Sequence, residues 1–221
     1  SGLVGANRGN AVMGLSHSPR IVTDGLVLCL DAANSRSYPK TGTKWTDLKG
    51  SNDGTFDNGP TFTTDNLGGI ALDGSDDAIT IPLASIPTPE NSSNFTYEAV
   101  VRFDSTSQFK CVVSQDNGTG SGKFLLGLQR SNKKPVTFVR GVQDRALNLD
   151  EMVAGGIYAL SFGVSGSNIY LGQNGVLDLV NTSSFSYTGT GDINIGTEPG
   201  AGGSLDFGLA KFKVLEYTIE F

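Results

Sequence analysis

Hydrophobic and polar residues alternate along much of the chain, with the period of two that marks a β-strand with one buried face. The clearest case is the segment FTYEAVVRF, residues 95–103, in which Phe95, Tyr97 and Phe103 share one face. The segment IYALSFGV, residues 157–164, repeats the pattern. We therefore predict a strand at each place, with one face in a core and the other in solvent.

Shorter apolar segments of the same kind recur to the end of the chain, separated by residues that favour turns. They include KFLLGLQR, PVTFVRG, NIYLGQ, DINIG and LAKFKVLEY. Asn-Gly and Asp-Gly pairs between such segments tolerate the positive φ of tight turns. No segment with the period of a helix is long enough to predict one. The pattern predicts an all-β fold of two antiparallel sheets packed as a sandwich, although the same alternation also suits a barrel.

The chain divides near residue 20. Residues 1–20 are dominated by Gly, Ala, Asn and Ser, and their larger apolar residues follow no clear period. These apolar residues are Leu3, Val4, Val12, Met13 and Leu15. Strand patterns fill the rest of the chain without a linker. We predict an N-terminal arm over residues 1–20 and one domain over residues 21–221, since all-β domains often reach this size as single units.

The acidic balance of the chain narrows its partners. The net charge is −6 and the pI is about 4.7, whereas nucleic-acid binding requires clustered Lys and Arg. The most basic stretch, residues 130–134, is interpreted as a solvated hairpin loop. No apolar run reaches the length of a membrane span, and the arm lacks the features of a signal peptide. We predict no nucleic-acid or membrane partner, and synthesis in a cytoplasm.

Residues that could carry catalysis are sparse. Cys29 and Cys111 each lie in an apolar stretch, which favours buried thiols over a disulfide or a zinc site. His17 is the only histidine, and it lies in the arm, where no rigid element supports a catalytic base. The glycine-rich segment 116–123 lacks the Gly-Lys-Ser/Thr end of a phosphate loop. No strand carries acids at alternate positions, which would direct several carboxylates of a glycosidase into one cleft. We predict that the protein is not an enzyme.

One acidic cluster allows a metal to be considered. The segment LDGSDDAITIP places Asp73, Asp76 and Asp77 within five residues, and calcium takes several oxygen ligands. The alternative is a turn whose carboxylates accept hydrogen bonds from nearby backbone N–H groups. We favour the turn, keep calcium as the alternative, and predict no other cofactor.

The stretch from Asp24 to Gly50 contains the single tryptophan and many small polar residues. Its first part predicts a strand in which Leu26, Leu28 and Leu30 share one face. We interpret Trp45 as part of the core, in preference to a platform for sugar stacking. The polar residues expected to hold its turns are Asp31, Asn34 and Asp47.

Three segments carry a more specific signal: GLVLCLDAANSRSYP, TKWTDLKGSNDGTFDNGPTF and GGIALDGSDDAITIP. Together they resemble the concanavalin A-like, laminin-G-like jelly-roll domains of phage structural proteins, and FTYEAVVRF and IYLGQNGVLDLV are similar to later parts of that pattern. The resemblance runs from about Ile21 to Tyr217 and implies a jelly-roll sandwich. Two departures are Lys49, where serine is usual, and the ending TIEF, which replaces a polar tail.

The resemblance also implies a role. It favours a virion structural protein, most directly a head decoration protein on the virion surface, with capsid or other virion proteins and copies of itself as partners. We expect assembly contacts in the arm and at the C-terminal edge. The residues are Leu3, Val4, Val12, Met13, Leu15, Ile219 and Phe221. The alternative is a carbohydrate-binding module of a tail or fibre that attaches to host-surface glycans, because some relatives bind carbohydrate.

Overall fold

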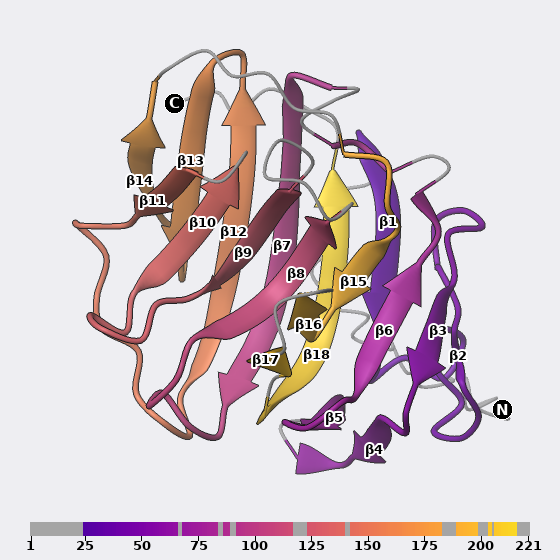
Figure 1. Cartoon of the computed structure of the whole chain (residues 1–221). Helices are drawn as coiled ribbons and strands as arrows, with labels where there is room; N and C mark the ends of the chain where they lie inside the picture. Colours follow the sequence, from indigo (N-terminus) through magenta and orange to yellow (C-terminus); the bar gives the residue numbers. More distant parts are fainter. Residues whose placement is uncertain are drawn as a thin grey trace, which may run out of the picture.

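The computed structural model consists of strands joined by turns and loops (Figure 1). It describes residues 24–65, 68–83, 86–88, 92–116, 123–139, 142–182, 189–198, 203–204 and 206–215. Within these ranges no helix is long and apolar enough to cross a membrane. The predicted arm, with His17 and the five apolar residues named above, lies outside the described residues, and so do Ile219 and Phe221.

The first sheet is antiparallel and has its latest strand near its centre. Its strands are β1 (Leu26–Asp31), β4 (Thr61–Thr63), β5 (Gly69–Asp73), β7 (Asn94–Phe103), β12 (Ile157–Ser165), β13 (Asn168–Gln173), β14 (Val176–Asn181) and β18 (Asp206–Leu215). They follow the order β14–β13–β12–β7–β18–β5–β4. One side of β18 pairs with β7, and the other pairs first with β5 and then with β1.

The second sheet packs against the first, as Figure 1 shows. Its strands are β2 (Lys44–Trp45), β3 (Gly54–Asp57), β6 (Ala78–Ile81), β8 (Lys110–Asp116), β9 (Lys123–Leu128), β10 (Pro135–Val139), β11 (Val142–Arg145) and β15 (Ile193–Ile195). Their order is β11–β10–β9–β8–β15–β6–β3–β2, and a short hairpin of β16 (Thr197–Glu198) and β17 (Gly203–Ser204) follows. The sandwich is confirmed, and the barrel that the alternation also allowed is not observed.

The core lies between the sheets and is rich in aromatic rings. Phe95 and Tyr97 from β7 meet edge to face at 5.6 Å, and Phe162 from β12 stacks on Phe124 from β9 at 5.6 Å. All four side chains are fully buried. Along β7, buried and partly exposed residues alternate from Tyr97 to the end of the strand, so the predicted one-sided pattern is confirmed. Replacing one such ring by alanine typically costs about 3–5 kcal/mol.

The first strand differs in one respect from its prediction. Leu28 and Leu30 join the main core, but Leu26 belongs to a separate small cluster with Cys29 and Leu48. The cause is a shift in the pairing of β1 with β18 between Leu26 and Leu28, because a register shift of one residue turns side chains to the other face. Trp45 is fully buried in the main core, which confirms its predicted place.

One edge of the sandwich is closed by a carboxylate. Asp178 in β14 accepts hydrogen bonds from the backbone N–H groups of Leu147 (2.8 Å) and Asn148 (3.0 Å) in the β11–β12 loop. The Asn148 side chain adds a third bond of 2.9 Å. Lys134 Nζ donates to the Leu147 carbonyl at 2.9 Å. The buried thiols of Cys29 and Cys111 are not joined by a disulfide.

Candidate functional site

The acidic cluster forms a tight turn between β5 and β6. Carboxylate oxygens of Asp73, Asp76 and Asp77 all lie within 4.8 Å of one another. Asp73 accepts a 2.8 Å hydrogen bond from the backbone N–H of Ser75, and Asp77 accepts one of 2.9 Å from the N–H of Asp73. The carboxylates therefore make the backbone bonds expected of the turn, and they also lie close enough together to have been considered as cation ligands.

The three carboxylates differ in environment. Asp73 and Asp76 are exposed, whereas Asp77 is only 4% exposed. The N–H of Ser75 and other backbone donors lower the pKa of Asp73 below its usual value. Burial raises the pKa of Asp77, and the negative charges of Asp73 and Asp76 add to this rise. The turn is thus a region of negative potential in which one buried carboxylate is held at an electrostatic cost.

A second loop meets this turn from the side of β3. Asn58 Nδ2 donates a 2.9 Å hydrogen bond to the backbone carbonyl of Asp76. Asn58 has a φ of 65° and Gly59 has a φ of 117°, a backbone that the Asn-Gly pair tolerates. The residue before Asn58 is Asp57, the last of β3, so this loop joins the acidic turn to the polar side of the second sheet.

A row of polar side chains crosses that sheet beside the acidic turn. Thr80 in β6 pairs in register with Thr55 in β3 and with Asn194 in β15, so their side chains lie on one face. Thr80 Oγ1 lies 2.6 Å from Asp57 Oδ2 and 3.4 Å from Asn194 Oδ1. Asp57, Thr80 and Asn194 are all partly exposed, and we call these three residues the polar row.

Sequence reasoning missed the polar row. Asp57 and Thr80 are 23 positions apart, and Thr80 and Asn194 are 114 positions apart. The available signal was that each is a polar residue between inward-facing apolar ones, as Thr80 is between Ile79 and Ile81. That signal places each residue on an outer face, but only the pairing of the strands brings the three together.

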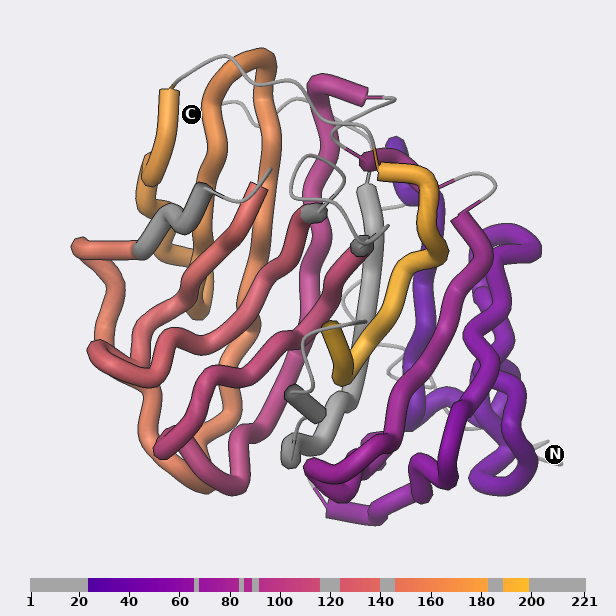
Figure 2. The backbone as a smooth tube through the Cα atoms, viewed as in Figure 1, coloured from indigo at the N-terminus to yellow at the C-terminus, as the bar shows by residue number. Residues whose placement is uncertain are grey.

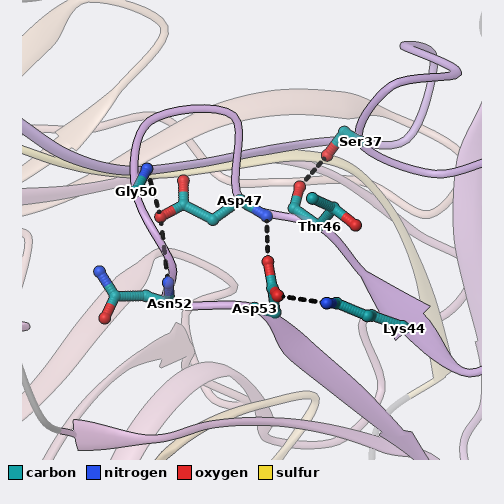
Figure 3. Close-up of polar contacts among 7 residues, drawn as sticks. All are labelled: Ser37, Lys44, Thr46, Asp47, Gly50, Asn52 and Asp53. Atoms are coloured by element: carbon teal, nitrogen blue, oxygen red, sulfur yellow. Dashed lines mark hydrogen bonds and ion pairs between the residues drawn. The ribbon is translucent and has the colours of Figure 1, made fainter.

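The polar residues of the opening stretch serve its loops instead (Figure 3). Asp47 Oδ2 accepts hydrogen bonds from the N–H groups of Gly50 (3.0 Å) and Asn52 (3.3 Å). The N–H of Asp47 donates to Asp53 Oδ1 at 2.8 Å, and the other oxygen of Asp53 pairs with Lys44 at 2.6 Å. Asp31 and Asn34 each accept a bond from an N–H two residues later. The predicted turn-holding role of Asp31, Asn34 and Asp47 is confirmed.

The acidic turn is also the only place, within the described part of the chain, where three or more His, Cys, Asp or Glu side chains bring ligand atoms together. Two of its three carboxylates are occupied by bonds to their own turn. A glycosidase requires one carboxylic acid and one carboxylate on opposite sides of a sugar linkage. A turn whose carboxylates come from five consecutive residues does not provide two opposed walls.

Comparisons with known proteins agree on the fold. Residues 73–220 match the family model of the concanavalin A-like lectin/glucanases superfamily. No curated protein matches the sequence. Among solved structures, the chain is similar to Trypanosoma rangeli sialidase, with a TM-score of 0.66 and 16% identity, over 89% of this chain and 31% of the sialidase. It therefore spans about a third of that enzyme's length.

Two further solved structures are domains that the chain matches more completely. Domain 4 of AbnA, an extracellular arabinanase from Geobacillus stearothermophilus, was solved in complex with arabinotriose. It aligns with a TM-score of 0.67 and 11% identity over 88% of this chain and 94% of the domain. The binding domain of botulinum neurotoxin serotype D aligns with a TM-score of 0.66 and 10% identity, over 90% of this chain and 50% of that one. At such identities the likeness concerns the fold.

Proposed function

Because the chain belongs to the concanavalin A-like lectin/glucanases superfamily, we propose that it is a glycan-binding module without catalytic activity. The observation that carries the proposal is the alignment with domain 4 of the arabinanase. That domain was solved with arabinotriose, and the alignment covers nearly all of both chains. The sialidase, by contrast, is about three times as long as the part that this chain matches.

The acidic side chains support binding over hydrolysis. The carboxylates of Asp73 and Asp77 are engaged by backbone N–H groups of their own turn. In the polar row, Asp57 lies beside a hydroxyl and an amide. Carboxylate, hydroxyl and amide groups on one partly exposed surface are the kinds of groups that fix the orientation of a polar ligand.

A glycan array tests this proposal directly. The full chain, labelled at an introduced surface cysteine, is applied to immobilised plant, bacterial and animal glycans, and bound sugars are then measured by calorimetry. We expect binding with Kd in the micromolar to millimolar range, corresponding to roughly −8 to −4 kcal/mol, and no release of reducing ends. An array without signal contradicts glycan binding, and turnover of a bound glycan contradicts the non-catalytic part.

We also propose a second role, as a structural protein of a phage virion, because the motifs in residues 21–81 resemble those of phage jelly-roll domains. In this role the arm, with Leu3, Val12 and Leu15, binds neighbouring subunits through its apolar side chains. Deleting residues 1–20 is expected to leave the sandwich folded but to abolish incorporation into particles. Electron microscopy of purified particles provides the measurement, and normal decoration by the truncated protein contradicts this role.

A further inference from the structure

The polar row leaves hydrogen-bond acceptors open to solvent. The single proton of the Thr80 hydroxyl takes the shorter bond, 2.6 Å to the Asp57 carboxylate, because charge-assisted bonds are the stronger ones. Asn194 Oδ1, 3.4 Å from the same hydroxyl, therefore receives no proton from it. Among the described residues, no donor is bonded to the second oxygen of Asp57. Two acceptors thus flank one hydroxyl and face donors from outside.

The orientation of the amide in this row is set by its own strand. Asn194 Nδ2 donates to the backbone carbonyl of Asp192 at 3.0 Å. The Asp192 carboxylate in turn accepts a 3.2 Å bond from the N–H of Leu83. A flipped amide would lose the bond to the Asp192 carbonyl, so the amide oxygen and not the nitrogen is directed to the row.

The charges around the row are negative. Asp57 belongs to it, and the bond from Asn58 to Asp76 places the acidic turn next to it. On the opposite side, Lys44 pairs in register with Thr55, but its ammonium group is occupied by Asp53 at 2.6 Å. The pKa of Asp77, raised by burial and by the charges of Asp73 and Asp76, agrees with a negative local potential. A ligand with its own negative charge is therefore repelled.

We infer that the polar row binds a glycan through the glycan's hydroxyl donors, and that this glycan carries no negative charge. The inference rests on the proposed glycan binding and assigns to it a place and a ligand class. Sugar hydroxyls donate to Asp57 and Asn194, and Thr80 accepts or donates between them. Sugars with carboxylate, sulfate or phosphate groups bring further acceptors and further negative charge to a row that already has both.

Calorimetry on the full chain tests the ligand class with four trisaccharides. Arabinotriose and galactotriose are neutral, trigalacturonate is the anionic match of galactotriose, and a chitosan trisaccharide carries amino groups. We expect a neutral or amino trisaccharide to bind, and trigalacturonate to bind at least about tenfold more weakly than galactotriose, a difference of about 1.4 kcal/mol. The variant Asp76→Asn, which removes a charge from a side chain without hydrogen bonds in the described structure, should reduce that discrimination.

Two variants test the place. Asp57→Asn puts an amide donor where the ligand requires an acceptor, and Asn194→Ala removes the second acceptor. Each should weaken binding by at least about tenfold. The matched control is Asp150→Asn, an exposed carboxylate elsewhere on the chain, and it should change nothing. Thermal unfolding of each variant shows whether the sandwich is intact, since Asp57 and Thr80 also bond each other.

The outcomes separate this inference from the proposed function. Binding of none of the four trisaccharides overturns the inference, whereas any signal on the glycan array keeps the proposed function in place. Equal binding of galactotriose and trigalacturonate overturns the ligand class. Unchanged binding in both Asp57→Asn and Asn194→Ala overturns the place. An empty glycan array overturns the proposed function and this inference together.

Discussion

Asp47, in the loop after β2, accepts a 3.0 Å hydrogen bond from the backbone N–H of Cys29 in β1, although the two residues are 18 positions apart. The same oxygen accepts a 2.9 Å bond from the N–H of Lys49. With the bonds from Gly50 and Asn52 to its other oxygen, this one carboxylate satisfies four N–H groups. It attaches the loop to the edge of the first strand.

Replacing Asp47 by asparagine should destabilise the protein strongly. The amide nitrogen would face two backbone donors that now share a carboxylate oxygen, and buried donors left without an acceptor cost about 1–3 kcal/mol each. We expect a loss of about 2–4 kcal/mol in the free energy of unfolding, measured by urea denaturation. The exposed variant Asp150→Asn should stay within about 0.5 kcal/mol of the native chain. A similarly small effect of Asp47→Asn would contradict the role given to this carboxylate.

Asp178 should make stability fall at low pH. Burial opposes its ionisation, but the donors on Asn148 and Leu147 outweigh burial and lower its pKa below the usual value. A carboxylate whose pKa is lower in the folded state stabilises the fold above its unfolded pKa, about 3.9, and this stability is lost as pH falls through the folded value.

The measurement for Asp178 is a series of urea denaturations between about pH 2 and 7. The variant Asp178→Asn should show a smaller loss of stability over the acid range than the native chain, and lower stability at pH 7. Parallel curves for the two proteins would show that Asp178 contributes nothing to the acid sensitivity.

Asp77 should have the opposite effect. Its folded pKa is raised, first by burial and then by Asp73 and Asp76, so its contribution to stability is present below the unfolded pKa and lost as pH rises through the folded one. Asp77→Asn removes the charge but keeps an oxygen that can accept from the N–H of Asp73. We expect this variant to be at least as stable as the native chain at pH 7 by thermal unfolding. A clear loss at pH 7, unchanged at pH 4, would contradict the electrostatic argument.

Calcium should leave the melting temperature of the protein unchanged. Calcium takes six to eight oxygen ligands, whereas Asp73 and Asp77 already use carboxylate oxygens to hold their own turn. Differential scanning calorimetry with millimolar calcium and with a chelator is the measurement. A rise in melting temperature with calcium that disappears in Asp76→Asn would establish the metal site that we considered as the alternative.

The aromatic core should tolerate shape changes poorly. Phe162 stacks on Phe124 with an interplanar angle of 14°, and both are fully buried. Phe162→Ala is expected to cost about 3–5 kcal/mol, and Phe162→Leu less because it leaves a smaller cavity. Chemical denaturation of both variants checks the order. Equal costs for the two substitutions would show that cavity size does not set the loss.

The fold could be predicted from local pattern because each strand shows its own alternation. Residues 95–103 show it clearly, and the structure places them at the centre of the first sheet as β7. The role of Asp47 was also predictable, because its main partners lie within five residues along the chain. Local pattern did not show the register shift in β1, which arises from its pairing with the distant strand β18. The polar row escaped prediction for the same reason, since it exists only when β3, β6 and β15 are side by side.

The position of β18 determines when the protein can fold during synthesis. Residues 206–215 are the last strand described, yet they lie between β7 and the pair formed by β5 and β1, as the grey segment in the middle of Figure 2 shows. A ribosome that has translated the first 200 residues has produced both flanks of the first sheet and nothing to join them. The apolar faces of those flanks must wait for the final strand, so the nascent chain depends on late, long-range pairing, and folding is expected to be slow and open to capture by chaperones until β18 emerges.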